Sequence, residues 1–338
     1  MKQYTHAWLA LKAVALLETY SGRFSTERNK RVDRLLEFLS HHPSTFVRGA
    51  WFPDNVIKDN VQGGHTWKYS LDSADSREVT YRPPSHNTCL PFVEPELGKK
   101  VKLEKGISDL PDRCEALSQA IRDAILITNK MGRGDVIAFN DSQVATLFLM
   151  LSHYVCDAHV PVHCDERDFY DPSKVHPDLE GYWEKEIKKY YSVSTKLKQF
   201  DLDENQKLQL DIGSDTRKKN YEKSVLYECE RVLKQSAWEK MNRKEKDWRD
   251  FLGSTNGNLW DYLVSVCLVS FHMSLKLFPP GGADYRSKDF RIMKTSPFKE
   301  DVIKYSPYIL ADSISSVALV WLATWERWEL LAQGSGKK

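Results

Sequence analysis

NDSQVATLFLMLSHYVCDAHVPVH, residues 140–163, is the stretch that does most to decide the fold of this chain. Apolar residues recur along it at helical spacing. Asn140 followed by Gln143 is typical of a capping box, which predicts that a helix begins here. Pro161 cannot continue a helix, so the stretch predicts a helix over 140–159 followed by an irregular turn.

Helical spacing continues through most of the 338 residues, whereas alternating, strand-like runs are scarce. The fold class is therefore expected to be mainly α, with many helices. The predicted helices cover residues 5–20, 25–41, 112–131, 140–159, 177–196, 217–250, 257–277 and 308–333.

The stretch 43–111 differs because it is rich in Pro, Gly and aromatic residues and has no helical period. A long irregular segment in a compact domain is usually functional. No internal repeat or low-complexity linker interrupts the chain, so residues 1–338 are expected to form a single domain. Within it, 200–256 is interpreted as a helical insertion, and the mixed charges of 217–250 as a solvated helix face.

Composition and charge limit the classes of function. The 49 Lys and Arg residues nearly balance the 47 Asp and Glu residues, which leaves a net charge of +2 and no overall field that would attract polyanions. The six cysteines form no CxxC pair, so a disulfide framework is not expected.

The beginning of the chain and its most apolar stretch bear on location. Lys12 interrupts the apolar start and no small-residue cleavage site follows, so no signal peptide is expected. No stretch reaches the ~18–20 uncharged apolar residues of a membrane span, and the nearest, 309–325, contains Asp312. A cytoplasmic protein is expected as numbered, or a secreted one if a leader precedes this sequence. It would make at most transient contact with a membrane surface and have no transmembrane segment.

Two pairs of side chains have the spacing of metal ligands. His153 and Asp157 are four residues apart, so on one helix face both can reach the same ion. His176 and Glu180 repeat this spacing near a predicted helix start, and both can face His163 on the irregular turn. Imidazole and carboxylate are standard zinc donors.

Three further residues add to the predicted cluster. Asp54 and His65 lie in the irregular segment, where a rigid scaffold can direct them inward, and His6 lies on the first predicted helix. His159 follows His153 by six residues, so helical direction takes it away from the pair, and it is expected to have a structural or supporting role. These positions favour a site with more than one metal ion.

Together the motifs resemble the zinc-dependent phospholipase C family and its relatives, the single-strand-specific zinc nucleases and 3′-nucleotidases. LSHYVCDAHVPVH resembles the family signature almost position by position, and THAW, GAWFPD and GGH occur in the family's order. The resemblance covers residues 1–185 clearly and 308–333 loosely. It implies a single-domain, multi-helix fold in which the long irregular segment binds metal.

The resemblance also implies how zinc is held. Two zinc ions are expected, and a third would depend on the amino and carbonyl groups of residue 1. At that residue this chain has Met1, where characterised relatives expose a tryptophan. The implied ligand sets are Asp54, His65, His153 and Asp157 for one ion, His163, His176 and Glu180 for another, and Met1, His6 and a bridging Asp157 for the third.

The implied activity is phospholipase C-like hydrolysis of a phosphodiester by water that the metal ions activate. Asp54 is expected to orient or deprotonate this water as well as to bind metal. Glu180 is similar to the phospholipases, whereas the five-residue gap between Met1 and His6 is similar to the nucleases. The partner is thus a phospholipid headgroup or, as the alternative, the phosphoester of a nucleotide in a 3′-nucleotidase or single-strand nuclease.

Two other interpretations stay open. The first concerns the aromatic residues in or near the irregular segment, which either line a substrate pocket or belong to the core. These residues are Trp51, Phe52, Trp67, Tyr69 and Phe92. The zinc could also only staple the fold of a non-catalytic module, although structural zinc sites are usually rich in cysteine.

Overall fold

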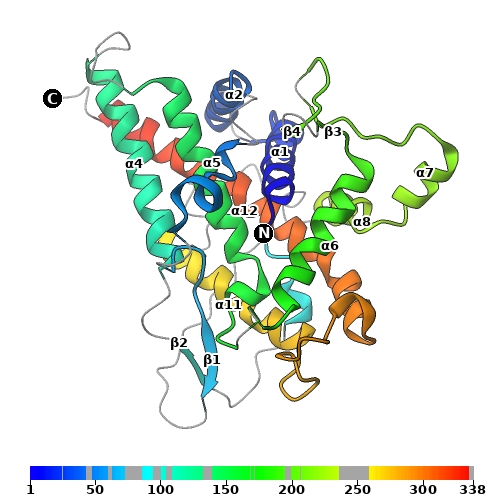
Figure 1. Cartoon of the computed structure of the whole chain (residues 1–338). Helices are drawn as coiled ribbons and strands as arrows, with labels where there is room; N and C mark the ends of the chain where they lie inside the picture. Colours follow the sequence, from blue (N-terminus) through cyan, green and yellow to red (C-terminus); the bar gives the residue numbers. More distant parts are fainter. Residues whose placement is uncertain are drawn as a thin grey trace.

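The computed structural model describes residues 1–24, 26–42, 48–59, 63–72, 86–93, 100–103, 109–131, 139–167, 169–170, 172–194, 199–205, 207–235 and 259–334. Helices dominate this part of the chain, and its strands are short (Figure 1). The prediction of a mainly α fold class is confirmed.

The helices follow the chain in this order: α1 (Gln3–Tyr20), α2 (Thr26–Ser40), α4 (Leu110–Met131), α5 (Asp141–Ala158), α6 (Val175–Tyr190), α7 (Asp215–Tyr221), α8 (Val225–Lys234), α11 (Leu259–Leu277) and α12 (Phe298–Gly334). Shorter turns of helix are η1 (Pro53–Ile57), η3 (Leu90–Phe92), η4 (Pro161–His163) and η5 (Ile292–Lys294). Strand β1 (Tyr69–Asp72) pairs antiparallel with β2 (Lys100–Leu103), with Tyr69 opposite Leu103. Strand β3 (Val193–Ser194) pairs antiparallel with β4 (Gln199–Phe200).

Helix α5 is the central element of the core. Its predicted capping box is present, because the Asn140 side chain accepts from the Gln143 backbone N–H while the Gln143 side chain accepts from the Asn140 backbone N–H. Every residue from Phe148 to Ala158 is buried, since α1, α4, α11 and α12 surround this half of the helix. A helix that is buried all round is a rigid base for side chains that project from it.

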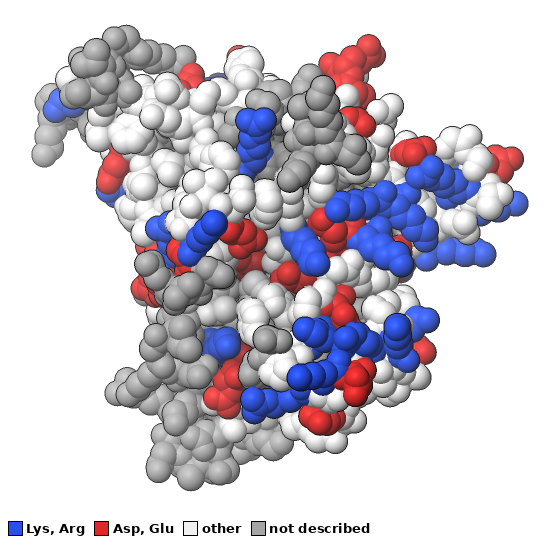
Figure 2. All heavy atoms as spheres, viewed as in Figure 1, with Lys and Arg blue, Asp and Glu red and all other residues white. Residues whose placement is uncertain are grey.

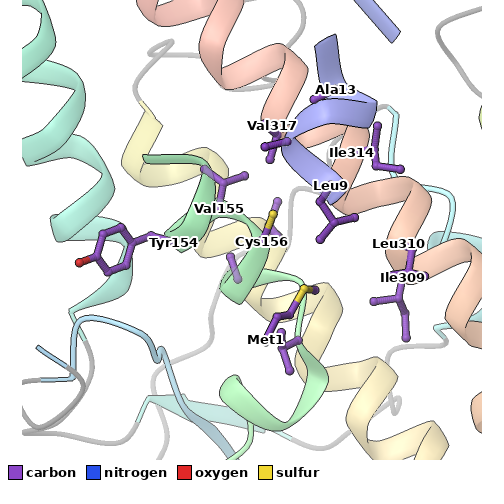
Figure 3. Close-up of a cluster of buried hydrophobic side chains, with 14 of the residues drawn as sticks. Met1, Leu9, Ala13, Tyr154, Val155, Cys156, Ile309, Leu310, Ile314 and Val317 are labelled. Carbon is purple, nitrogen blue, oxygen red and sulfur yellow. The ribbon is translucent and has the colours of Figure 1, made fainter. Parts of the chain in front are cut away.

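Opposite faces of α5 pack on different helices. In Figure 3, Val155 and Cys156 point toward Leu9 of α1 and Val317 of α12. Tyr154 points the other way, toward α4, where its hydroxyl lies 3.3 Å from Nε of Arg113. The end of α5 is thereby fixed on several sides.

Some predicted boundaries were wrong. Helix α12 begins at Phe298, ten residues before the predicted start (308 − 298), because the helix continues through Pro307. Helix α6 ends at Tyr190, after which the chain turns into β3. The predicted helix 217–250 is divided into α7 and α8, and residues 236–250 lie outside the described part.

One helix of the described part, Phe298–Arg327 within α12, is long and apolar enough by composition to cross a membrane. The most apolar part of this stretch is 94% buried inside the protein. The early start of α12 lengthens this stretch beyond the predicted 309–325. Burial of this kind is typical of a core helix, so the stretch is weak evidence for a membrane span.

Candidate metal centre

Two irregular segments run side by side and bring their histidines together. The backbone N–H of Trp67 donates to the carbonyl of His163 at 3.2 Å, and that of Tyr69 donates to Cys164 at 2.9 Å. The ring of His163 lies with Nδ1 3.0 Å from the carbonyl oxygen of His65. The segment after GGH is therefore tied to the segment that follows α5.

The structure explains why glycine occupies both positions before His65 in the GGH motif. Gly63 has a φ of 78°, in the left-handed region that favours glycine. A side chain at Gly64 would place its Cβ 3.1 Å from Oδ2 of Asp59, tighter than an ordinary contact. The two glycines let the chain turn sharply into His65 beside a carboxylate.

His153 and Asp157 project from the buried end of α5, as their spacing predicted. Nε2 of His153 lies 3.2 Å from Oδ2 of Asp157, and Nδ1 lies 2.7 Å from the carbonyl oxygen of Ala50. Ala50 can come this close because a Cβ at Gly49 would lie only 2.8 Å from Cβ of Leu149.

Three groups in the described part of the chain have ligand atoms that all lie within 4.8 Å of one another. The first is His6, His153 and Asp157; the second is Asp54, His65 and His153; the third is His163, His176 and Glu180. The structure thus brings together, in these groups, eight of the nine residues that were predicted to bind metal. Met1, the ninth, adjoins them.

Ligand spacing within the groups suits a small metal ion. Two donors at about 2.0–2.1 Å from one tetrahedral zinc ion are about 3.3 Å apart. His65 Nδ1 and His153 Nε2 are 3.2 Å apart, and His163 Nε2 lies 3.1 Å from His176 Nε2 and 3.3 Å from Glu180 Oε1. The pair His176 Nε2 and Glu180 Oε1, at 2.6 Å, is closer than this.

In His65, His153 and His163, the ring nitrogen that points away from the cavity forms a hydrogen bond. This bond decides whether the other nitrogen faces the cavity with a lone pair. Carbonyl and carboxylate oxygens only accept, so His153 donates through Nδ1 to Ala50, and His65 donates through Nε2 to Asp59 at 2.8 Å. By the same argument Nδ1 of His163 donates to the His65 carbonyl. Each neutral ring then turns its remaining lone pair toward the other rings and toward Asp157, an arrangement that a cation stabilises.

Asp157 joins the groups because its two oxygens face different partners. Oδ2 lies 2.8 Å from Nδ1 of His65 and 3.2 Å from Nε2 of His153. Oδ1 lies 3.0 Å from the Met1 amino nitrogen and 3.6 Å from Nε2 of His6. This is the arrangement of a carboxylate that bridges two cations.

His6 supplies the test of whether a metal fits. Both of its ring nitrogens are buried and have no hydrogen-bond partner, although the ring is only 1% exposed. Buried polar atoms in proteins are almost always paired, so an orphaned imidazole requires an explanation. A metal ion between His6 and Asp157 would satisfy the ring, so the residues fit a metal.

Charge in the cavity is strongly coupled. Burial opposes the charged form of His153, but the carboxylates of Asp157 and Asp54 outweigh it and raise its pKa to about 9. Burial likewise opposes ionisation of Asp157, yet the Met1 amino group and His153 hold its pKa well below the usual range. The carboxylates therefore stabilise positive charge in the cavity, whether it is carried by protons or by metal ions.

The centre opens on one side. Asp54 and His176 are its most exposed members, with side chains 34% and 17% exposed, whereas His153 and Asp157 are 0% and 1% exposed. Oδ1 of Asp54 lies 3.6 Å from Nε2 of His153. A substrate or water molecule would therefore reach the centre past Asp54.

Asp59 supports the centre although no sequence motif includes it. Its carboxylate accepts from His65 at 2.8 Å and from the hydroxyl of Tyr154 at 2.7 Å, and it lies 3.3 Å from Nε of Arg113. These contacts hold the His65 ring in one orientation. Asp59 follows no periodic spacing from His65 in an irregular segment, so no pattern could have identified it.

His159 and three of the five aromatic residues named above make contacts within the core. Nε2 of His159 lies 2.7 Å from Oγ of Ser316 on α12, and the ring contributes to none of the metal-binding groups found among the described residues. Trp67 and Tyr69 are buried in the core, where the Trp67 Nε1–H donates to the Tyr69 hydroxyl at 2.9 Å. Phe92 packs edge to face against Tyr308, with ring centroids 4.6 Å apart.

No protein-family model, curated protein or solved structure matches this chain. The resemblance to zinc-dependent phospholipases and nucleases therefore rests on the sequence motifs alone.

Proposed function

We propose that this protein is a zinc-dependent hydrolase of phosphoesters, with a phospholipase C-like activity. The observation that carries the proposal is the convergence of three groups of possible metal ligands on one centre, where Asp157 joins them because its two oxygens face different partners. Zinc is the metal proposed, because the donor set consists of neutral imidazoles and carboxylates with no thiolate. Structural zinc sites are usually closed and rich in cysteine, which argues against a mere staple.

Two ligand sets are proposed to be sufficient. Asp54, His65, His153 and Asp157 would hold one ion, and His163, His176 and Glu180 would hold another. A third ion would be held by His6, Asp157 and the amino group of Met1, which lies 2.7 Å from Oε1 of Glu180. When bound, zinc ions would supply Lewis-acid chemistry, by favouring the deprotonation of water and by neutralising charge on phosphate oxygens.

The chain's own residues would orient the reaction. Burial opposes the charged form of Asp54, but without metal the hydrogen bond and positive charge of His153 lower its pKa to about 2. When zinc replaces the proton on His153, the charge of the ion would keep Asp54 a carboxylate. From the exposed side of the centre, its carboxylate could orient the attacking water and accept a proton. Asp59, through His65, and Ala50, through His153, would keep the ligand rings aimed at the cavity.

The test combines metal analysis with three substrates on one preparation. We expect about two or more zinc ions per chain by elemental analysis and hydrolysis of phosphatidylcholine that EDTA abolishes and zinc restores. Single-stranded DNA and 3′-AMP serve as parallel substrates. Hydrolysis of these nucleotides alone would replace the phospholipase by a nucleotidase or nuclease.

A purely structural zinc would give a different result. A zinc content near one per chain, together with no EDTA-sensitive hydrolysis of any of the three substrates, would exclude the hydrolase. Asp54→Asn is the informative variant, since Asp54 is the ligand on the open side. If it acts on the nucleophile, activity should fall much more than zinc content does.

A further inference from the structure

Helix α6 presents different residues on opposite faces. His176 and Glu180 lie on the face that meets the metal centre. Lys185 and Lys189 follow Glu180 by five and nine residues, so at about 100° per residue they are turned roughly 140° and 180° away from it. What lies behind α6 is therefore separated from the metal centre by the helix itself.

Behind α6 the protein surface forms a cavity of about 810 Å³. Its walls are α6, the turn between α7 and α8, and the segment 291–303 that includes η5 and the start of α12. Six cationic side chains line it but only two acidic ones, Asp178 and Glu186; the cations are Lys185, Lys189, Lys223, Arg291, Lys294 and Lys299. We call this cavity the basic groove.

Contacts between side chain and backbone fix the walls of the basic groove. The carboxylate of Asp178 accepts from the backbone N–H of Ile292 at 3.2 Å, which ties η5 to α6. The hydroxyl of Tyr190 donates to the carbonyl of Asn220 at 3.1 Å, which ties the end of α6 to the α7–α8 turn. Hydrogen bonds to α6 therefore hold both other walls of the groove in place.

The cations of the groove outnumber its carboxylates by six to two. The two carboxylates offset part of the positive charge, since Glu186 lies 3.9 Å from Nζ of Lys189 and Asp178 interacts electrostatically with Arg291 and Lys294. Within the described ranges, Lys185, Lys223 and Lys299 form no ion pair with any carboxylate. Figure 2 shows basic side chains gathered on the side of the molecule where Figure 1 places α6, α7 and the segment before α12. An anion placed among these cations would relieve their mutual repulsion.

We infer that the basic groove binds a compact anion that carries several phosphate groups. Its volume is in the range of about 300–1,000 Å³ that small-molecule sites occupy. Lysine ammonium groups act as point charges for phosphate oxygens, and Tyr182, Asn220 and Ser224 add polar groups to the wall. A concave site lined by three elements of the fold suits a small polyphosphate better than the flat surface of a bilayer. This inference does not depend on the proposed hydrolase activity.

Isothermal titration of the zinc-loaded full chain with inorganic tripolyphosphate tests the inference. We expect saturable binding that weakens at least tenfold in the double variant Lys185→Glu, Lys299→Glu, with zinc content unchanged. The matched control is Lys130→Glu, Lys234→Glu, which changes the net charge equally at exposed positions outside the groove. The control should bind like the original chain.

Further binding measurements distinguish the basic groove from other possible anion sites. Asp157→Asn, which disrupts the proposed metal centre, should keep its affinity for tripolyphosphate; loss of binding would place the anion at the metals and overturn the inference. Equal weakening in both double variants, or equal affinity for orthophosphate, would also overturn it. So would a result in which the groove variant loses binding to phosphatidylserine vesicles but keeps binding to tripolyphosphate.

Discussion

His65 donates a hydrogen bond from Nε2 to the carboxylate of Asp59 at 2.8 Å, while its Nδ1 faces the metal centre. A carboxylate behind a ligand histidine fixes the tautomer and the direction of the ring and makes the ring a better donor. Asp59 is therefore expected to act on the metal through His65, although it does not reach the centre itself.

Asp59→Asn should lower zinc affinity by about 10–100-fold, the usual cost of removing such a partner. Competition with a fluorescent zinc chelator measures it. Tyr154→Phe is the matched control, because it removes the hydroxyl that donates to Asp59 at 2.7 Å and leaves the His65 contact in place. An Asn variant with unchanged affinity, or a Phe variant that loses as much, would contradict the role of Asp59.

Asp157→Asn and His159→Ala should have opposite profiles. Asp157 faces His65 and the Met1 amino group with different oxygens. The Asp157→Asn variant should therefore contain less than about half of the zinc that the original chain binds. His159 contacts Ser316, which keeps a hydrogen bond from Tyr262 when His159 is removed. The variant therefore leaves mainly a buried cavity, which should cost about 2–4 kcal/mol of stability. Zinc analysis and chemical denaturation give the two readouts, and equal metal loss in both variants would contradict this division of roles.

The effect of His6→Phe on stability should change sign when metal is bound. The ring of His6 stacks on that of His153 with centroids 3.7 Å apart, and phenylalanine keeps the stack. Without metal, the orphaned nitrogens destabilise the fold, so the variant should be about 1–3 kcal/mol more stable than the original chain after EDTA treatment.

In excess zinc the order should reverse, because the original chain gains the metal bond that the His6 variant lacks. Thermal unfolding of both proteins with EDTA and with zinc measures the crossover. A stability difference that is the same in both conditions would show that His6 binds no metal.

His86 should make stability depend on pH. Burial lowers its pKa to about 3, from an ordinary value of about 6.5. A histidine with a depressed pKa in the folded state stabilises the protein above about pH 6.5 and loses that contribution as the pH falls toward 3. The slope is up to about 1.4 kcal/mol per pH unit.

The matched variant for this effect is His86→Gln, which keeps a hydrogen-bonding group near the hydroxyl of Tyr262. Urea denaturation between pH 7 and 4 should show the original chain losing stability relative to the variant as the pH falls. Parallel curves would mean that His86 does not remain neutral in the fold.

The sequence predicted the parts of the centre that follow a periodic element. Spacing along α5 and α6 placed His153 with Asp157 and His176 with Glu180, because a helix brings residues four apart onto one face. It also directed His159 away from the pair. The structure agrees on all of these placements.

Other features could not be predicted in this way. Asp59 depends on the path of an irregular segment, and the basic groove depends on α6, the α7–α8 turn and residues 291–303 meeting in space. The continuation of α12 through Pro307 was missed because proline is usually read as a helix boundary. Each of these outcomes is decided by tertiary packing and not by local spacing.

Helix α12 contributes no residue to the metal-binding groups found in the described part of the chain, yet it packs against α1 and α5, which carry His6, His153 and Asp157. During synthesis on a ribosome, the ligands up to Glu180 therefore emerge long before the helix that supports them. A newly made chain would display its histidines and carboxylates while the last support is still missing. Stable metal binding is therefore expected only after α12 has been made and has packed against α1 and α5.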